Sequence, residues 1–154
     1  MTSVRKEITV ETSQARAFRA FTEEHGAWWP LATHHIGEKD AETAIIEPHA
    51  GGRWFERAAD GTECQWGKVL VWDPPTRVLL AWQINVQFKY DPTALSEVDI
   101  RFSAESPSVT IVELEHRNIE KLGAGAAEFR SKVDAPQGWG GILDLYAACA
   151  AAEK

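Results

Sequence analysis

The sequence predicts an α+β fold in which a curved antiparallel sheet of about six to seven strands wraps around a long C-terminal helix, with short helices after the first strand. Three observations predict it. The chain has 154 residues, the length of one domain, and no repeat or linker divides it, so we expect a single domain over residues 1–154. Short apolar runs separated by turn signals occupy residues 43–116. An Ala-rich segment with helical spacing follows.

The first strand has the clearest period, because Val4, Ile8 and Val10 alternate with polar residues. Thr12 and Ser13 follow and offer hydroxyls that can cap the N-terminus of a helix. Apolar residues at helical spacing within 17–21 predict that helix, and Gly26 is expected to close it. Trp28–Pro30 then interrupts the helical pattern, since a residue before proline is pushed out of the helical region. A short helical turn is expected within 31–37.

Strand patterns separated by turn signals fill the middle of the chain. The expected strands are Arg53–Ala58, Gln65–Trp72, Arg77–Ile84, Val98–Phe102 and Thr110–His116. Asp60-Gly61 between the first two is a typical hairpin turn. Consecutive strands with such short connections must be antiparallel, because a parallel return needs a long crossover.

The C-terminal helix is expected to begin near Asp134–Pro136. It carries one apolar stripe, made by Trp139, Ile142, Leu143 and Tyr146. Glycines 138, 140 and 141 each cost a helix about 1 kcal/mol relative to alanine. Either this backbone lies close against another element, or the helix begins after Gly138.

One helix cannot fill the concave side of such a sheet. A helix is about 10 Å across, whereas six strands about 4.8 Å apart span roughly 30 Å. The sheet must therefore curl around the helix, or large side chains and a cavity must fill the remaining space. This mismatch is the physical reason to expect a pocket.

Composition restricts the partners. Sixteen Lys and Arg against 23 Asp and Glu give a net charge of −7, which argues against nucleic acid and anionic membranes as partners. No secretion signal or membrane-spanning stretch is found, so we expect a cytoplasmic protein. Cys64 and Cys149 match no metal-ligand spacing, and the adjacent His34 and His35 belong to no metal motif. We expect no metal and no cofactor.

Several segments together carry a resemblance to a known family. They are Gly51–Glu56, Gly67–Pro75 and Arg77–Trp82, supported in the same order along the chain by Trp28–Pro30, Leu114–His116 and Gly138–Trp139. The chain resembles the single-domain proteins related to the activator of heat-shock protein 90 ATPase, within the START-like (SRPBCC, helix-grip) superfamily.

The resemblance implies a seven-stranded antiparallel sheet wrapped around a long C-terminal helix, with a deep cavity between them. It implies much less about activity. The family takes its name from a co-chaperone, so a chaperone partner and a role in the stress response are among its implications. Other branches of the superfamily bind lipids, hormones or polyketides, or act as cyclases.

Seven tryptophans are the most unusual feature of the composition. Strand alternation places three of them, Trp54, Trp66 and Trp82, on the face that meets Trp139 and Tyr146. Rings of this size either fill a core or form the wall of a pocket, and both interpretations stay open. The expected cavity lining is Trp54, Glu56, Trp66, Lys68, Leu80, Trp82, Phe102, His116, Trp139, Leu143 and Tyr146.

Three of these residues are charged or titratable. An inward Glu56 should find a partner, and Lys68 on the neighbouring strand is the expected one. With His116 they can orient a polar group of a ligand or supply a general acid and base. The structural alternative is a cross-strand ion pair and a hydrogen-bonded histidine, and it is favoured over catalysis, so no catalytic residue is assigned.

Three functions are compatible with these residues and with the resemblance. The first is a binding protein, monomeric or homodimeric, that holds a small, mostly apolar molecule between the sheet and the C-terminal helix. The second is a cyclase, dehydratase or hydrolase that uses Glu56, His116 or Tyr146, and it requires these side chains to converge in the cavity. The third is a co-chaperone-like surface, which requires an exposed apolar patch.

Overall fold

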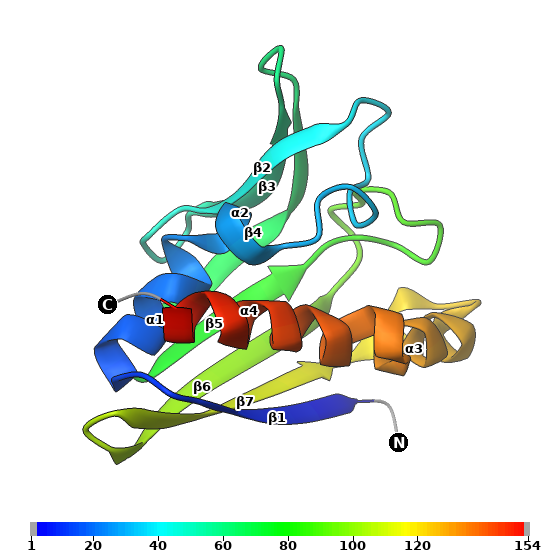
Figure 1. Ribbon diagram of the computed structural model, residues 1–154. Helices are drawn as coiled ribbons and strands as arrows, with labels where there is room; N and C mark the ends of the chain where they lie inside the picture. Colours follow the sequence, from blue (N-terminus) through cyan, green and yellow to red (C-terminus); the bar gives the residue numbers. More distant parts are fainter. Residues whose placement is uncertain (1–2, 153–154) are drawn as a thin grey trace.

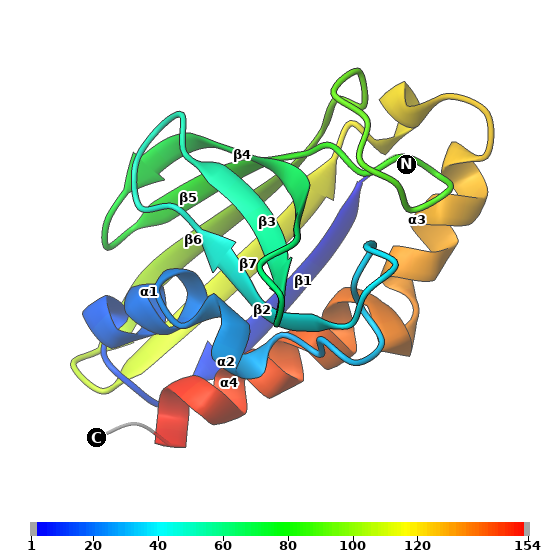
Figure 2. The same cartoon turned by 90° about the horizontal axis from the view of Figure 1, so that it is seen from above.

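A single antiparallel sheet of seven strands forms the frame of the molecule, as predicted. The computed structural model describes residues 3–152 (Figures 1 and 2). The strands are β1 (Val4–Val10), β2 (Ala41–Ile46), β3 (Arg53–Ala58), β4 (Glu63–Asp73), β5 (Arg77–Trp82), β6 (Ser96–Ser106) and β7 (Val109–Arg117). Their order is β1-β7-β6-β5-β4-β3-β2, so neighbours along the chain pair from β2 to β7, and β1 joins β7 at the far edge.

Helices cover the concave side of this sheet. They are α1 (Gln14–Thr22), α2 (His25–Trp28), the turn η1 (Ile119–Leu122), α3 (Ala126–Asp134), the turn η2 (Pro136–Gly140) and α4 (Gly141–Ala152). Helix α4 runs along the open side of the curled sheet, with α1 and α2 near its C-terminal end and α3 near its N-terminal end (Figures 1 and 2). No helix within residues 3–152 is long and apolar enough to cross a membrane.

The expected helix after β1 is present, but it ends earlier than predicted. Ser13 caps α1, and its hydroxyl accepts a hydrogen bond from the Arg16 amide. The helix ends at Thr22, and Gly26 lies inside α2, so the expectation that Gly26 closes the first helix is wrong. Gly26 instead allows a close approach to β2, because a Cβ there would lie 2.1 Å from Thr43 Oγ1. The helical turn expected within 31–37 is a non-helical loop.

Strand β4 departs from simple alternation at two places. Its pairing with β3 shifts register opposite Trp54 and Phe55, and its pairing with β5 shifts between Val69 and Val71. Trp66 and Val69 are therefore buried while Lys68 is exposed. The prediction that Trp66 and Lys68 share the inward face is wrong, because the bulge at Trp66 moves the following side chains to the other face of the sheet.

The C-terminal helix begins later than Asp134–Pro136. Helix α3 ends at Asp134, a non-helical residue at Gly138 breaks the chain direction, and α4 starts at Gly141. The alternative that the helix begins after Gly138 is therefore confirmed. The backbone also approaches closely there, since a Cβ on Gly138 would lie 2.1 Å from the Val133 carbonyl oxygen. The apolar stripe from Trp139 to Tyr146 is buried as predicted.

Aromatic side chains fill the interior at the C-terminal end of α4. Phe21 packs edge-on against Tyr146 at 5.2 Å between ring centroids, and Trp28 lies 5.2 Å from the same Tyr146 ring. Phe18 and Phe102 extend this cluster toward the sheet at 5.1 Å. Large side chains therefore occupy the space beside the helix at this end. The opposite end is different.

Candidate functional site

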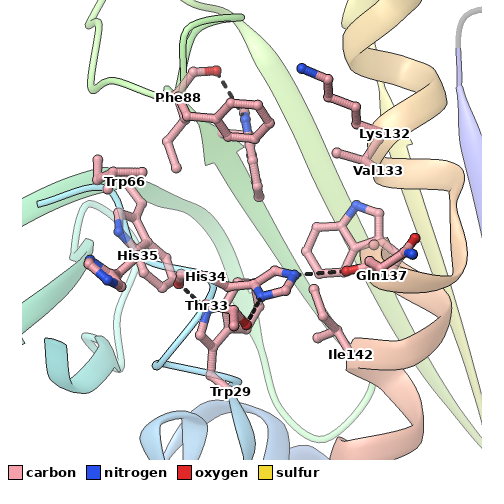
Figure 3. A pocket seen from close by; sticks show the side chains of 15 residues that line it. Trp29, Thr33, His34, His35, Trp66, Phe88, Lys132, Val133, Gln137 and Ile142 are labelled. Carbon is pink, nitrogen blue, oxygen red and sulfur yellow. Dashed lines mark hydrogen bonds between the residues drawn. The ribbon is translucent and has the colours of Figure 1, made fainter. Parts of the chain in front are cut away.

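A cavity of about 370 Å³ opens beside the N-terminal end of α4 (Figure 3). This volume lies in the range of roughly 300–1,000 Å³ that is typical of small-molecule sites. The cavity is lined by four indoles (Trp29, Trp66, Trp82 and Trp139) and three aliphatic side chains (Ile84, Val133 and Ile142). Six residues surround its mouth: Thr33, His34, His35, Phe88, Lys132 and Gln137. Ile36 and Gly138 complete the lining.

The N–H groups of all four cavity indoles are already used inside the protein. Trp29 donates to the His34 carbonyl at 2.9 Å, and Trp82 donates to the Ile84 carbonyl at 3.0 Å. Trp66 donates to Glu56 Oε1 at 2.8 Å, and Trp139 donates to His116 Nδ1 at 3.1 Å. The indoles therefore present only carbon surface to the cavity.

His116 stands behind this wall and holds Trp139 in place. Because its Nδ1 accepts from the indole, its Nε2 carries the proton and donates to Ser96 Oγ at 3.0 Å. The Ser96 hydroxyl in turn donates to the Trp82 carbonyl at 3.1 Å. Complete burial lowers the pKa of His116 to about 3, so the ring is neutral. Both nitrogens are occupied, which leaves none for proton transfer to a ligand.

His25 plays the same part for Trp54. Its Nε2 accepts from the Trp54 indole at 3.1 Å, and its Nδ1 donates to the Phe21 carbonyl at 3.1 Å. Burial lowers the pKa of His25 to about 3. Trp54 packs at 5.6 Å from both Trp66 and Trp82, so it supports the cavity wall from behind.

Glu56 pins the loop that forms one side of the mouth. Its buried carboxylate accepts from the backbone amides of Ile36 at 2.6 Å and Gly37 at 3.2 Å, in addition to the Trp66 indole. The predicted Glu56–Lys68 pair is wrong, because Lys68 lies opposite Arg53 in the register and points outward. Donors from the loop and the indole satisfy this carboxylate instead.

Replacing Glu56 by glutamine is expected to destabilise the protein by about 2 kcal/mol, because the charge-assisted hydrogen bonds become neutral and Gly37 N–H loses its acceptor. Urea unfolding of Glu56→Gln measures the change. Glu38→Gln, an exposed neighbour on the same loop, is the control and should unfold like the parent. Equal stability of Glu56→Gln and Glu38→Gln would show that the carboxylate does not hold the loop.

The structure separates the predicted site residues into four groups. Trp66, Trp82 and Trp139 line the cavity. Glu56 and His116 lie behind its walls, and Lys68 lies outside. The remainder belong to the packed core and do not line the cavity: Trp54, directly behind its wall, and Leu80, Phe102, Leu143 and Tyr146.

The expectation that Glu56, His116 and Tyr146 converge in the cavity as a general acid and base is therefore wrong. The Tyr146 hydroxyl donates to the Ala17 carbonyl at 2.7 Å in the filled end of the molecule, and burial raises the pKa of Tyr146. Glu56 and His116 are each saturated by different indoles. The three side chains do not meet at one place in the cavity, because each is hydrogen-bonded to a different buried partner.

Most residues at the mouth of the cavity were not predicted from the sequence. Thr33, His34 and His35 come from the loop after α2, Phe88 from the segment between β5 and β6, and Lys132 from the last turn of α3. His34 reaches across to the opposite side, where Nε2 donates to the Gln137 carbonyl at 2.7 Å (Figure 3). The one available signal was a polar, aromatic loop directly after Trp28–Pro30, since loops frequently carry binding residues.

No metal site is found in the part of the chain that the structure describes, residues 3–152. There, no three His, Cys, Asp or Glu side chains are grouped in a way that could hold a metal ion. The absence of a cofactor stays a prediction.

Comparison with known proteins gives a family and a set of similar structures. The sequence profile of the family described as "Activator of Hsp90 ATPase homolog 1-like protein" matches residues 11–150. A structure of an anthrahydroquino-gamma-pyrone synthase shares 33% sequence identity over 97% of this chain and 97% of that chain, with a TM-score of 0.67. CalC from Micromonospora echinospora, described as a self-sacrificing resistance protein, shares 28% identity over 96% of this chain and 93% of that chain, with a TM-score of 0.72.

A more distant relative has the same fold. The Aha1 dimer from Colwellia psychrerythraea shares 16% identity, with complete coverage of both chains (100% and 100%) and a TM-score of 0.62, which shows the fold alone. Among curated proteins, none matches this sequence significantly.

Proposed function

This chain belongs to the family of Activator of Hsp90 ATPase homolog 1-like proteins, and from that premise we propose that it binds a small, mostly apolar molecule with a planar aromatic body. The observation that carries the proposal is the cavity of about 370 Å³ beside α4, walled by four indoles. Rigid aromatic faces bind flat rings at a low cost in conformational entropy, and they bury a large apolar area.

The arrangement of the indoles supports a flat ligand. Trp29 lies 5.9 Å from Trp139, and Trp82 lies 5.8 Å from the same Trp139 ring, so the walls hold one another in position. The hydrogen bonds from each indole to His34, Glu56, Ile84 and His116 fix the ring planes. A preorganised wall of this kind loses little freedom on binding.

The names of two relatives agree with this ligand class. The synthase at 33% identity is named for a fused, ring-containing product, an anthrahydroquino-gamma-pyrone. CalC, at 28% identity, is described as a resistance protein, an activity that is compatible with the capture of a small molecule. We extend to this chain only the class of ligand, a planar ring system, and propose no particular compound.

Filling the cavity tests the proposal. Ile142 lies on α4 and lines the cavity, so Ile142→Phe adds an aromatic ring to the space that the ligand needs. We expect dissociation constants for polycyclic aromatic probes to rise at least about tenfold, measured by quenching of tryptophan fluorescence. Leu145→Phe, an exposed position on the same helix, is the matched control and should bind like the parent.

The complementary measurement is native mass spectrometry of the protein purified from its own cells. A retained small molecule that Ile142→Phe loses and Leu145→Phe keeps supports binding in the cavity. If the probes bind equally to all three proteins, the ligand site lies elsewhere and the proposal is wrong.

The identity to a synthase favours one second candidate function, catalysis in the same cavity. In that case His35 or Lys132 at the mouth would have to transfer protons, because Glu56, His116 and Tyr146 are occupied elsewhere and both ring nitrogens of His34 are hydrogen-bonded. Mass spectrometry of a bound probe before and after incubation distinguishes the two functions. An unchanged mass argues for binding alone.

We place the protein in the cytoplasm, as a monomer or homodimer. Cys64 and Cys149 are not joined in a disulfide, which is compatible with a reducing compartment. A chaperone partner stays a prediction from the family name, and Phe88, Tyr90 and Leu95 are the exposed apolar residues that such a partner would meet on the segment between β5 and β6. A pull-down with a heat-shock protein 90 homologue tests it.

A further inference from the structure

The polarity of the cavity changes sharply between its depth and its mouth. In the depth, each of the four indole N–H groups is hydrogen-bonded within the protein, so none is left for a ligand. Ile84, Val133 and Ile142 add only carbon. A hydroxyl or carbonyl group buried there would lose its hydrogen bonds to water and gain no replacement, which costs free energy.

The mouth carries a cation that the protein does not neutralise. Lys132 lines the cavity from the last turn of α3, and no carboxylate of the described residues lies within ion-pair distance of it, including Glu128 one turn earlier. Its ammonium group lies 5.6 Å from the centre of the Phe88 ring. Figure 3 shows the two side chains facing one another at one side of the opening, with Gln137 on the same rim.

Phe88 places the face of an aromatic ring next to this cation at the entrance. The residue has a left-handed backbone, with φ at +60°, which is unusual for a bulky side chain. Asn85 holds the turn through hydrogen bonds from the amides of Gln87 and Lys89 to its side-chain oxygen. Phe88 also packs on Phe129 at 5.3 Å, so its ring keeps a defined position beside Lys132.

We propose that the ligand is an aromatic acid that enters with its unsubstituted rings first and leaves an ionised oxygen, a carboxylate or phenolate, at the mouth beside Lys132. This inference rests on the proposed function and adds the polarity and orientation of the ligand. Two observations carry it: an indole wall with no free donor in the depth, and an unpaired ammonium group at the entrance. Both follow from the positions of described residues.

Three naphthalene probes test the two halves of the proposal by isothermal titration calorimetry at neutral pH. We expect 2-naphthoate to bind about fivefold more tightly than neutral 2-naphthamide, the effect expected for a partly exposed charge pair. We expect 6-hydroxy-2-naphthoate, which carries a hydroxyl at the buried end, to bind about tenfold more weakly than 2-naphthoate because that hydroxyl finds no partner.

Two variants test whether Lys132 causes the preference for 2-naphthoate over 2-naphthamide. Lys132→Met keeps the length and apolar stem of the side chain, and it should abolish the preference for 2-naphthoate over 2-naphthamide without changing the binding of 2-naphthamide. The effect of the 6-hydroxyl should persist in this variant. Lys121→Met, an exposed lysine on η1 outside the cavity lining, is the control and should keep the preference.

The outcomes separate this inference from the proposed function. If the parent binds 2-naphthoate and 2-naphthamide equally, or if Lys132→Met keeps the preference, the acid is not held by Lys132 and the inference is overturned while binding in the cavity stands. Tolerance of the 6-hydroxyl overturns the proposed orientation. If none of the three probes binds, the proposed function fails and this inference fails with it.

Discussion

Lowering the pH from 7 to 5 should reduce the free energy of unfolding by about 4 kcal/mol, because two fully buried histidines, His25 and His116, stay neutral in the folded protein. Burial lowers the pKa of each to about 3, from an ordinary value of 6.5. At pH 5 a histidine that is protonated only in the unfolded chain contributes about 2 kcal/mol of destabilisation.

The direction follows from proton binding. Below pH 6.5 the unfolded chain takes up protons on these histidines while the folded protein does not, so protons favour unfolding. The stability is complete above pH 6.5 and is lost progressively as the pH falls toward about 3. Carboxyl groups titrate mainly below pH 5, so the interval between pH 7 and 5 reports chiefly on the histidines.

Replacing one histidine by a residue that cannot titrate separates the contribution of His116 to the pH dependence from that of His25. His116→Gln can still accept from the Trp139 indole and donate to Ser96, and it should halve the loss of stability between pH 7 and 5 in urea unfolding experiments. His49→Gln, at an exposed histidine, should leave the loss unchanged. A parent protein equally stable at pH 7 and 5 would mean that the buried rings are protonated in the folded state.

Gly138→Ala should be the other severe change, with a loss of about 3 kcal/mol or more in the free energy of unfolding. A Cβ at this position would lie 2.1 Å from the Val133 carbonyl oxygen, and 2.8 Å from that of Lys132. Backbone atoms cannot move aside as a flexible side chain can. Gly138 also has a non-helical backbone (φ −90°, ψ −137°) at the junction where α3 gives way to α4.

Gly140 supplies the matched control two residues later. A Cβ on Gly140 meets nothing within 4 Å, so Gly140→Ala should be neutral or stabilise the protein by up to about 1 kcal/mol. Thermal unfolding of both variants measures the contrast. Because Gly138 and Trp139 line the cavity, Gly138→Ala should also weaken ligand binding, whereas Gly140→Ala should not. Similar melting temperatures would show that the junction can relax.

Local patterns were enough to predict most of the strands and their antiparallel direction, although not the bounds of β2 or the pairing of β1 with β7. Arg53–Ala58 has the predicted bounds, and the strands around Val98–Phe102 and Thr110–His116 are observed with longer ends. Alternation with a period of two and Asp60-Gly61 are properties of neighbouring residues, so they can be read without knowing the rest of the fold. Short connections then leave only antiparallel pairing.

The orientation of the tryptophans required the tertiary structure. Lys68 points outward because β4 bulges against β3 at Trp66, and a bulge depends on how neighbouring strands pack together rather than on the sequence of one strand. Trp54 lies behind the cavity for a related reason, since its indole is bound by His25 from α2.

The sequence by itself determined the sheet, the terminal helix and the presence of more interior space than one helix can fill. Only the tertiary structure decided that aromatic rings fill this space at one end and leave a cavity at the other. Residues such as His34, Phe88 and Lys132 reach the mouth from three separate segments that have no shared period. Their convergence depends on long-range packing, which a pattern of neighbouring residues cannot encode.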